Sequence, residues 1–199
     1  VIQGWGMTEM SPLGTSNFLT PEMKKMSKEE RYSVQLKQGR PMYGVELKVV
    51  DDSGEDLPND GESQGHLLVR GPWVLKRYFK AEKDAVDKDG WFDTGDISVL
   101  DKDGYMTIKD RAKDVIKSGG EWISSIDLEN AAVGHSEITE ACVVGIPHPK
   151  WDERPIMFIV TNSGEPIDKE SILEFLGSIV AKWWLPDEII FLKELPHGA

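Results

Sequence analysis

The chain has 199 residues, of which 39% are apolar, so it can build one ordinary domain or two small ones around a hydrophobic core. It carries 23 Lys and Arg against 35 Asp and Glu. The resulting formal charge of −12 has the wrong sign for general binding to nucleic acids or anionic membranes, so these partner classes are excluded.

The cysteine content and hydropathy indicate the compartment. The single cysteine, Cys142, cannot form an internal disulfide or a cysteine metal cluster, and the apolar runs are too short to cross a bilayer. We therefore expect a soluble, cytoplasmic protein without a transmembrane segment. Residues 1–9 show no initiator Met, basic leader or cleavage-site pattern, so we expect the chain to be part of a longer protein.

Between residues 40 and 110, short β runs alternate with turn residues. The runs lie at 45–49, 66–70, 97–100 and 105–108. Turn residues at 51–54 and 101–104 separate them, and the second turn is typical of a hairpin. We expect this half to be mostly antiparallel sheet. The polar segment 23–31 is expected to form a surface loop or a short helix.

Helical patterns appear in the second half. Ser124, with Asp127 three residues later, resembles a capping box that begins a helix. A second helix is predicted to begin at Asp168 and to end before Pro186. Its predicted buried face consists of Ile172, Phe175, Leu176, Ile179 and Trp183.

Strand patterns complete the second half. They lie at 114–117, 121–123, 139–145, 155–161 and 188–192. The sequence thus predicts an α+β fold. We place a β-rich domain at 1–110 and a smaller α+β domain at 111–199.

The first segment that can carry chemistry is Gly4-Trp5-Gly6-Met7-Thr8-Glu9. Glycines let the backbone approach a planar ligand on which Trp5 could stack, while Thr8 and Glu9 suit a phosphate oxygen and a hard cation such as Mg²⁺. A buried glycine-rich turn with an exposed Glu explains the same residues. Local chemistry alone favours this structural explanation.

The second segment is Trp91-Phe92-Asp93-Thr94-Gly95-Asp96, expected between a loop and a strand. A carboxylate on a rigid strand end can accept hydrogen bonds from paired hydroxyls such as those of a ribose. Alternatively, Asp93 and Asp96 merely cap backbone N–H groups in an Asx-type turn. Taken alone, the segment favours the turn.

The third segment is a charged connector, Asp110-Arg111-Ala112-Lys113-Asp114, followed by Lys117-Ser118-Gly119-Gly120-Glu121. Arg111 could reach a phosphate or ribose oxygen, and a polar connector before a two-glycine hairpin would tolerate rotation of one domain on the other. A solvated linker with surface ion pairs explains the pattern equally well.

The remaining candidate segments and residues favour a structural role over a catalytic or metal-binding one. The segment from Gly61-Glu62 through Arg70-Gly71-Pro72 to Tyr78 has the pattern of a turn, a strand and a turn without a reactive group. The four histidines lack metal-ligand spacing and no serine has a nucleophile-elbow context, so hydrolase and metalloenzyme functions are disfavoured.

Together and in this order, the four segments resemble the motifs of the adenylate-forming superfamily, which includes acyl-CoA synthetases, luciferases and the adenylation domains of peptide synthetases. The resemblance covers essentially the whole chain. Within the superfamily, Ile116-Lys117-Ser118-Gly119-Gly120-Glu121-Trp122-Ile123-Ser124-Ser125 is most similar to the medium- and long-chain fatty-acyl and methylmercaptopropionyl CoA ligases.

The resemblance implies roles for matching residues in binding ATP or AMP. The segment Gly4-Trp5-Gly6-Met7 would lie along the adenine and the acyl pocket. Thr8 would meet the α-phosphate and Glu9 would hold Mg²⁺. Asp96 would take the ribose hydroxyls with the assistance of Arg111.

The resemblance also implies how CoA is delivered. Lys113 matches the hinge about which the small domain rotates, where such enzymes often carry Asp. Lys117 would act in the second half-reaction, with Ser118, Gly119, Gly120 and Glu121 beside the pantetheine of CoA. Trp122 would help to line that tunnel.

The implied reaction has two halves. A fatty-acid-like carboxylate and ATP give an acyl-adenylate and pyrophosphate, and the CoA thiol then displaces AMP. The family's phosphate loop and adenylating lysine would lie before Val1 and after Ala199, so we expect these 199 residues alone to be inactive. Carrier-protein loading, a luciferase-like oxidation and a non-catalytic nucleotide-binding module remain as alternatives, and a homodimer is compatible with the sequence but not indicated by it.

Overall fold

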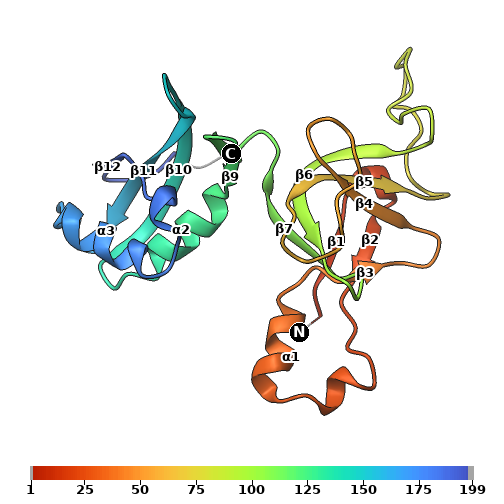
Figure 1. Cartoon of the computed structure of the whole chain (residues 1–199), viewed down its shortest axis with the longest axis horizontal. Helices are drawn as coiled ribbons and strands as arrows, with labels where there is room; N and C mark the ends of the chain where they lie inside the picture. The colour runs from red at the N-terminus through yellow and green to blue at the C-terminus, as the bar shows by residue number, and fades with distance from the viewer. Residues whose placement is uncertain (1, 197–199) are drawn as a thin grey trace. The chain divides into compact units, whose positions relative to one another are not determined.

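The computed structural model describes residues 2–196, and the chain divides into two compact units, Val1–Ala112 and Lys113–Ala199 (Figure 1). This boundary lies two residues after the one expected from the sequence. The reason is that Asp110 and Arg111 are still paired residues of strand β7 (Met106–Arg111), where they face Ile97 and Asp96 on β6.

The first unit contains two antiparallel sheets, and the antiparallel pairing predicted for residues 40–110 is confirmed. One sheet has three strands, β1 (Gly4–Gly6), β2 (Leu13–Ser16) and β3 (Arg40–Pro41). The other has four strands in chain order, β4 (Glu46–Val50), β5 (Gly65–Arg70), β6 (Phe92–Leu100) and β7. A single core joins them, because Trp5 and Met10 pack into the same buried cluster as Leu67, Val69 and Met106.

The strand β6 begins earlier than the sequence suggests. It starts at Phe92, so the segment 92–96 lies within a strand rather than between a loop and a strand. Gly95 has a φ of +71°, a left-handed conformation that glycine adopts without steric cost. The pairing of β6 with β7 shifts by one residue between Ile97 and Ser98, which marks a β-bulge beside Asp96.

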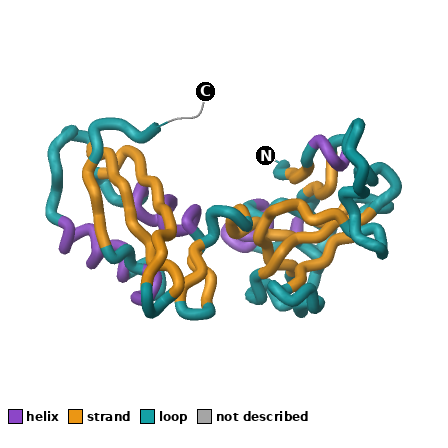
Figure 2. The backbone as a smooth tube through the Cα atoms, turned by 90° about the horizontal axis from the view of Figure 1, so that it is seen from above, coloured by secondary structure: helices purple, strands orange, loops and turns teal. Residues whose placement is uncertain are grey.

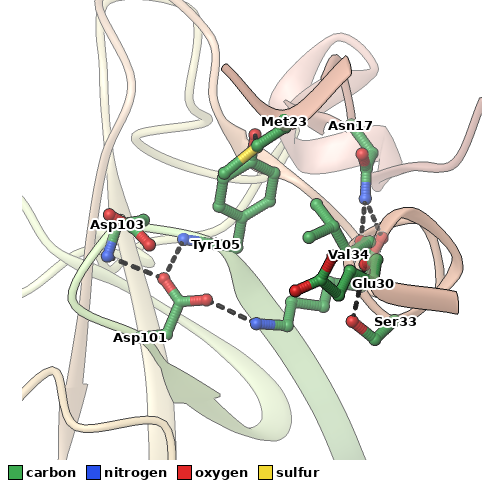
Figure 3. A network of polar contacts seen from close by, with 9 residues as sticks. Asn17, Met23, Glu30, Ser33, Val34, Asp101, Asp103 and Tyr105 are labelled. Carbon is green, nitrogen blue, oxygen red and sulfur yellow. Dashed lines mark hydrogen bonds and ion pairs between the residues drawn. The ribbon is translucent and has the colours of Figure 1, made fainter. Parts of the chain in front are cut away.

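The polar segment after β2 forms two short helices, η2 (Met23–Lys25) and α1 (Lys28–Gln35). Ser27 and Glu30 close a capping box at the start of α1. Figure 3 shows the polar network around this excursion. The Asn17 side chain donates to the carbonyls of Val34 and Lys37, each at 2.7 Å, and the Tyr105 hydroxyl donates to the carbonyl of Phe18 at 2.9 Å.

The second unit is one mixed sheet with two helices on one of its faces (Figures 1 and 2). Its strands are β8 (Ile116–Ser118), β9 (Glu121–Ile123), β10 (Ile138–His148), β11 (Asp152–Thr161) and β12 (Glu188–Phe191). The order is β10-β11-β8-β9, and β12 runs parallel to β11. Helices α2 (Ser125–Val133) and α3 (Lys169–Gly177) bury Leu128 and Ile172 against Met157 and Ile159 of the sheet.

The second predicted helix is shorter than expected. Asp168 caps α3 and Ile172 and Leu176 are fully buried, but the helix ends at Gly177. Ile179 and Trp183 are therefore 54% and 43% exposed rather than part of a buried face, and residues 182–184 form the 3-10 helix η3. Gly177 is a weak helix former, and the Ser178 hydroxyl donates to the carbonyl of Phe175, which competes with helix continuation.

Helix α2 begins where the sequence predicts, with Ser124 as its N-cap. The Ser124 side chain accepts a hydrogen bond from the backbone N–H of Asp127 at 3.1 Å, which is the N-cap half of a capping box. The helices within residues 2–196 include none that is both long and apolar enough to span a membrane.

Candidate functional site

Three of the predicted nucleotide-binding residues meet in the first unit. The indole Nε1 of Trp5 donates to Oδ2 of Asp96 at 3.0 Å, and the Arg111 guanidinium forms an ion pair with Oδ1 of the same carboxylate. The pairing of β6 with β7 sets Arg111 directly opposite Asp96. The Asp96 side chain is 5% exposed and that of Arg111 is 53% exposed. An exposed cation therefore compensates a buried carboxylate, which would be costly without a partner.

Trp5 is largely buried, and its role in ligand binding stays a prediction. The residue is only 8% exposed and belongs to the core of the unit, so it offers little ring surface for stacking on a ligand. A Cβ on Gly14 would lie 2.6 Å from the indole ring, so only a glycine leaves room for the ring there. In this structure the indole orients Asp96, whereas the exposed backbone of Gly4 and Gly6 remains open to a ligand.

The two carboxylates of the 91–96 segment behave differently. Asp93 is exposed, and its Oδ1 accepts from the backbone N–H of Gly95 at 2.9 Å, which is the Asx-type cap considered above. Asp96 instead holds Trp5 and Arg111. A carboxylate has about four acceptor positions, so Asp96 retains capacity for further donors such as ribose hydroxyls.

Glu9 lies in the short 3-10 helix η1 (Thr8–Met10), beside an exposed Thr8. The Tyr78 hydroxyl donates to Oε1 of Glu9 at 2.8 Å, and the backbone N–H of Leu75 donates to the Glu9 carbonyl at 2.7 Å. The hydrogen bond to Glu9, followed by burial and by the charge of Glu9, raises the pKa of Tyr78 above its ordinary value of 10.0. The sequence does not reveal Tyr78 as the partner of Glu9, because the two residues are 69 positions apart and only the tertiary fold brings them together.

The donor chemistry at Glu9 fits Mg²⁺. Magnesium prefers carboxylate oxygens and is usually held by one or two carboxylates together with water and substrate phosphates. The neighbouring Thr8 hydroxyl is exposed and adds a further oxygen. Within residues 2–196 there is no group of three or more His, Cys, Asp or Glu side chains arranged around a metal position.

The predicted CoA-facing residues form the β8–β9 hairpin of the second unit. Gly119 and Gly120 have φ values of +63° and +87°, so both occupy the left-handed region at the tip. The ammonium of Lys117 lies 5.1 Å from the centroid of the Trp122 ring, a cation–π contact. The Lys117 backbone N–H donates to Oε2 of Glu153 at 2.9 Å, which fixes the hairpin to β11.

A pocket of about 480 Å³ opens beside this hairpin. The hairpin contributes Ser118, Gly119 and Glu121 to its lining. The rest of the lining comes from Trp151, Arg154, Trp183 and Asp187. Trp151 and Trp183 are each 43% exposed, so the pocket presents two indole surfaces to a ligand.

Arg154 links several of the chain segments that line this pocket. Its guanidinium forms an ion pair with Asp187 at 2.8 Å and donates to the carbonyls of Trp183 and Leu185 at 2.8 and 2.9 Å. It also donates to the Ser118 hydroxyl at 3.2 Å, which links β8 to the segment before β12. The sequence assigned no role to Arg154 or Trp151 and placed Trp183 on a buried helix face, because the signal for this pocket lies in the tertiary fold.

Lys113 is the first residue of the second unit. Its side chain is 80% exposed, and its ammonium lies 3.9 Å from a carboxylate oxygen of Asp114. Such a weak surface pair contributes little rigidity. The hinge role of Lys113 stays a prediction.

Two family models match the sequence. The model described as AMP-binding enzyme matches residues 1–79, and the one described as AMP-binding enzyme C-terminal domain matches residues 127–199. The chain is 53% identical over its full length to 3-methylmercaptopropionyl-CoA ligase of Ruegeria lacuscaerulensis and 48% identical to medium-chain-fatty-acid–CoA ligase of Ectopseudomonas oleovorans. It spans 37% and 36% of the lengths of these relatives.

Solved structures with the same fold include one with a bound acyl-adenylate and one with bound ATP. One is o-succinylbenzoate CoA synthetase (MenE) from Bacillus subtilis in complex with the acyl-adenylate intermediate OSB-AMP, with a TM-score of 0.81 and 29% identity over 98% of this chain and 38% of that chain. Another is ATP-bound MatB from Rhodopseudomonas palustris, with a TM-score of 0.80 and 30% identity over 100% of this chain and 38% of that chain.

The mixed α+β fold with antiparallel sheets is thus that of the adenylate-forming enzymes. One family match lies in each half of the sequence. The chain belongs to the AMP-binding enzyme family.

Proposed function

We propose that the chain supplies nucleotide- and CoA-facing residues of an ATP-dependent acyl-CoA ligase that acts on a fatty-acid-like carboxylate. The observation that carries this proposal is the cluster of Trp5, Asp96 and Arg111, in a chain 53% identical to a named CoA ligase. A cytoplasmic location is part of the proposal, and the free thiol of Cys142 is consistent with a reducing compartment.

The nucleotide would be held through its ribose and phosphates. Asp96 would accept hydrogen bonds from the ribose hydroxyls, while Trp5 and Arg111 keep its carboxylate in one orientation. The Arg111 guanidinium is half-exposed, so its remaining N–H groups can reach a ribose or phosphate oxygen. Thr8 would donate its hydroxyl to the α-phosphate.

Glu9 would hold Mg²⁺ through its carboxylate. When bound, the ion would neutralise charge on the phosphates. The role of this chain is to keep the carboxylate oriented. The hydrogen bond donated by Tyr78 does this by holding one of the two carboxylate oxygens.

The chemistry would proceed in two displacements. An oxygen of the substrate carboxylate attacks the α-phosphorus of ATP, and the bond to pyrophosphate breaks. The CoA sulfur then attacks the acyl carbon after losing its proton, and the carbon–oxygen bond to AMP breaks. Lys117, Trp122 and the glycine turn at 119–120 would guide the thiol, and the adjoining pocket is large enough for part of CoA.

The proposal is tested by Asp96→Asn in the full-length protein that contains this chain. Asparagine keeps the shape but loses the charge and half of the acceptor capacity, so KM for ATP in ATP–pyrophosphate exchange should rise about tenfold or more. The matched control is Asp93→Asn, which lies three residues away and keeps its Asx cap. An unchanged KM for ATP in Asp96→Asn would contradict the proposal.

The acyl acceptor can be tested in the same assay. The full-length protein should form a thioester with free CoA. Loading of a phosphopantetheinyl carrier protein without any use of CoA would favour the carrier-loading alternative.

A further inference from the structure

The loop between β5 and β6 contacts Glu9 twice, through its backbone and through a side chain. The N–H of Leu75 donates to the Glu9 carbonyl at 2.7 Å, and the hydroxyl of Tyr78 donates to Glu9 Oε1 at 2.8 Å. From this geometry we infer that Tyr78 is a positioning residue, which sets the orientation of the Glu9 carboxylate toward the metal–nucleotide complex.

The two contacts act on different parts of Glu9. The bond from Leu75 fixes the main chain of η1, but a glutamate side chain still has three rotatable bonds. The bond from Tyr78 restricts those bonds by holding one carboxylate oxygen. Because Tyr78 engages Oε1, the second oxygen, Oε2, would be the one to take other ligands.

The loop that carries Tyr78 is itself braced. The guanidinium of Arg77 contacts the carboxylate of Asp84 at 2.6 Å, and the N–H of Ala85 donates to the Lys76 carbonyl at 2.8 Å. The N–H of Ala81 donates to the carbonyl of Tyr78 at 3.0 Å, which closes a turn at that residue. A braced donor restricts its acceptor more than a donor on a freely moving side chain would.

The exposure of Tyr78 and Glu9 fits a positioning role for Tyr78 better than a role in packing the core. Tyr78 is 49% exposed and Glu9 is half-buried, so the pair lies at the surface, where a ligand can reach it. Removing one hydroxyl from a half-exposed ring leaves no cavity in the core. Tyr78→Phe is therefore expected to fold normally and to lose only the hydrogen bond.

The inference rests on the proposed function, in which Glu9 holds the metal. The test uses Mn²⁺ as a paramagnetic probe for Mg²⁺, and electron paramagnetic resonance counts free Mn²⁺ in the presence of the full-length protein and ATP. In Tyr78→Phe the apparent dissociation constant for Mn²⁺ should rise about three- to tenfold, as expected for the loss of one net hydrogen bond. The KM for the carboxylate should stay unchanged.

Two further variants make the test specific. The control is Tyr43→Phe, which removes the same hydroxyl from a tyrosine that is 99% exposed, and should leave Mn²⁺ binding unchanged. Glu9→Gln should weaken Mn²⁺ binding, and adding Tyr78→Phe to it should cause little further loss, because the two residues act through one carboxylate.

The outcomes separate the two proposals. If Glu9→Gln weakens Mn²⁺ binding and Tyr78→Phe does not, the positioning role is overturned and the proposed function stands. Fully additive losses in the double variant also overturn the positioning role. If the wild-type protein binds no Mn²⁺ with ATP and forms no acyl-adenylate, the proposed function fails and this inference fails with it.

Discussion

At the scale of single residues, the candidate site depends on one buried carboxylate. Asp96 is held by Trp5 from the core and by Arg111 from the solvent side, so its charge is compensated before any ligand arrives. Preorganised charge of this kind reduces the reorganisation that binding requires. Glycine is required at position 6 by internal packing, since a Cβ there would lie 1.9 Å from the Pro12 carbonyl oxygen.

Trp5→Phe tests this arrangement at the residue scale. The variant removes the N–H donor to Asp96 and leaves a space beside Gly14, so the free energy of unfolding should fall by about 1–3 kcal/mol. Equilibrium urea denaturation measures the change. Trp73→Phe is the control, because that indole is 37% exposed and makes no contact with Asp96. Equal losses in the two variants would refute the role of Trp5.

At the scale of elements, turns anchor the segments between strands. Asp101 sits in the β6–β7 turn, where its Oδ1 accepts from the N–H groups of Asp103 and Tyr105 and its Oδ2 pairs with Lys37 at 2.6 Å (Figure 3). The Asp101 carboxylate therefore closes the β6–β7 turn and also links this turn to the segment that contains α1.

Asp101→Asn should lower stability in a pH-dependent way. Burial raises the pKa of Asp101, but the hydrogen bond from Lys37 and those from the backbone outweigh it, so the pKa is lowered from 3.8. A carboxylate with a lowered pKa in the folded state stabilises the protein at pH values above its ordinary pKa. This stabilisation is lost as pH falls through the pKa of the folded state. We expect a loss of about 0.5–1 kcal/mol at pH 7, modest because Lys37 is 32% exposed and water screens the pair.

Hydrogen–deuterium exchange across β6 and β7 measures this loss, with Asp103→Asn as the exposed control in the same turn. The difference in stability between wild type and Asp101→Asn should become smaller below pH 3.8, the ordinary pKa of an aspartate. A difference that stays constant with pH would show that charge is not the cause.

Sequence patterns predict the elements well where the signal is local. The hairpin turn at 101–104, the N-cap at Ser124 and the strand at 188–191 follow directly from turn and capping residues. The length of α3 does not, because apolar spacing continues past Gly177 while the chain leaves the helix. Contacts between distant segments, such as Glu9 with Tyr78, carry no local signal at all.

At the scale of the whole molecule, the proposed function requires the second unit to take part in both half-reactions by rotating at the connector. The predicted hinge, Lys113, begins the second unit and has an exposed side chain. Lys113→Pro should restrict rotation of the backbone there, whereas Lys113→Ala removes only the side chain. We expect near-normal adenylation in both variants but thioester formation slowed at least about tenfold in the proline variant alone. Normal CoA ligation by Lys113→Pro would contradict the hinge role.

The most direct test is a rapid-quench single turnover of the full-length protein with a fatty acid, ATP and Mg²⁺. We expect acyl-adenylate and pyrophosphate to form before CoA is added, and CoA then to convert the adenylate to acyl-CoA with release of AMP. Acyl-CoA formation without an adenylate, or no ATP turnover with any carboxylate of a chain-length panel, would contradict this expectation.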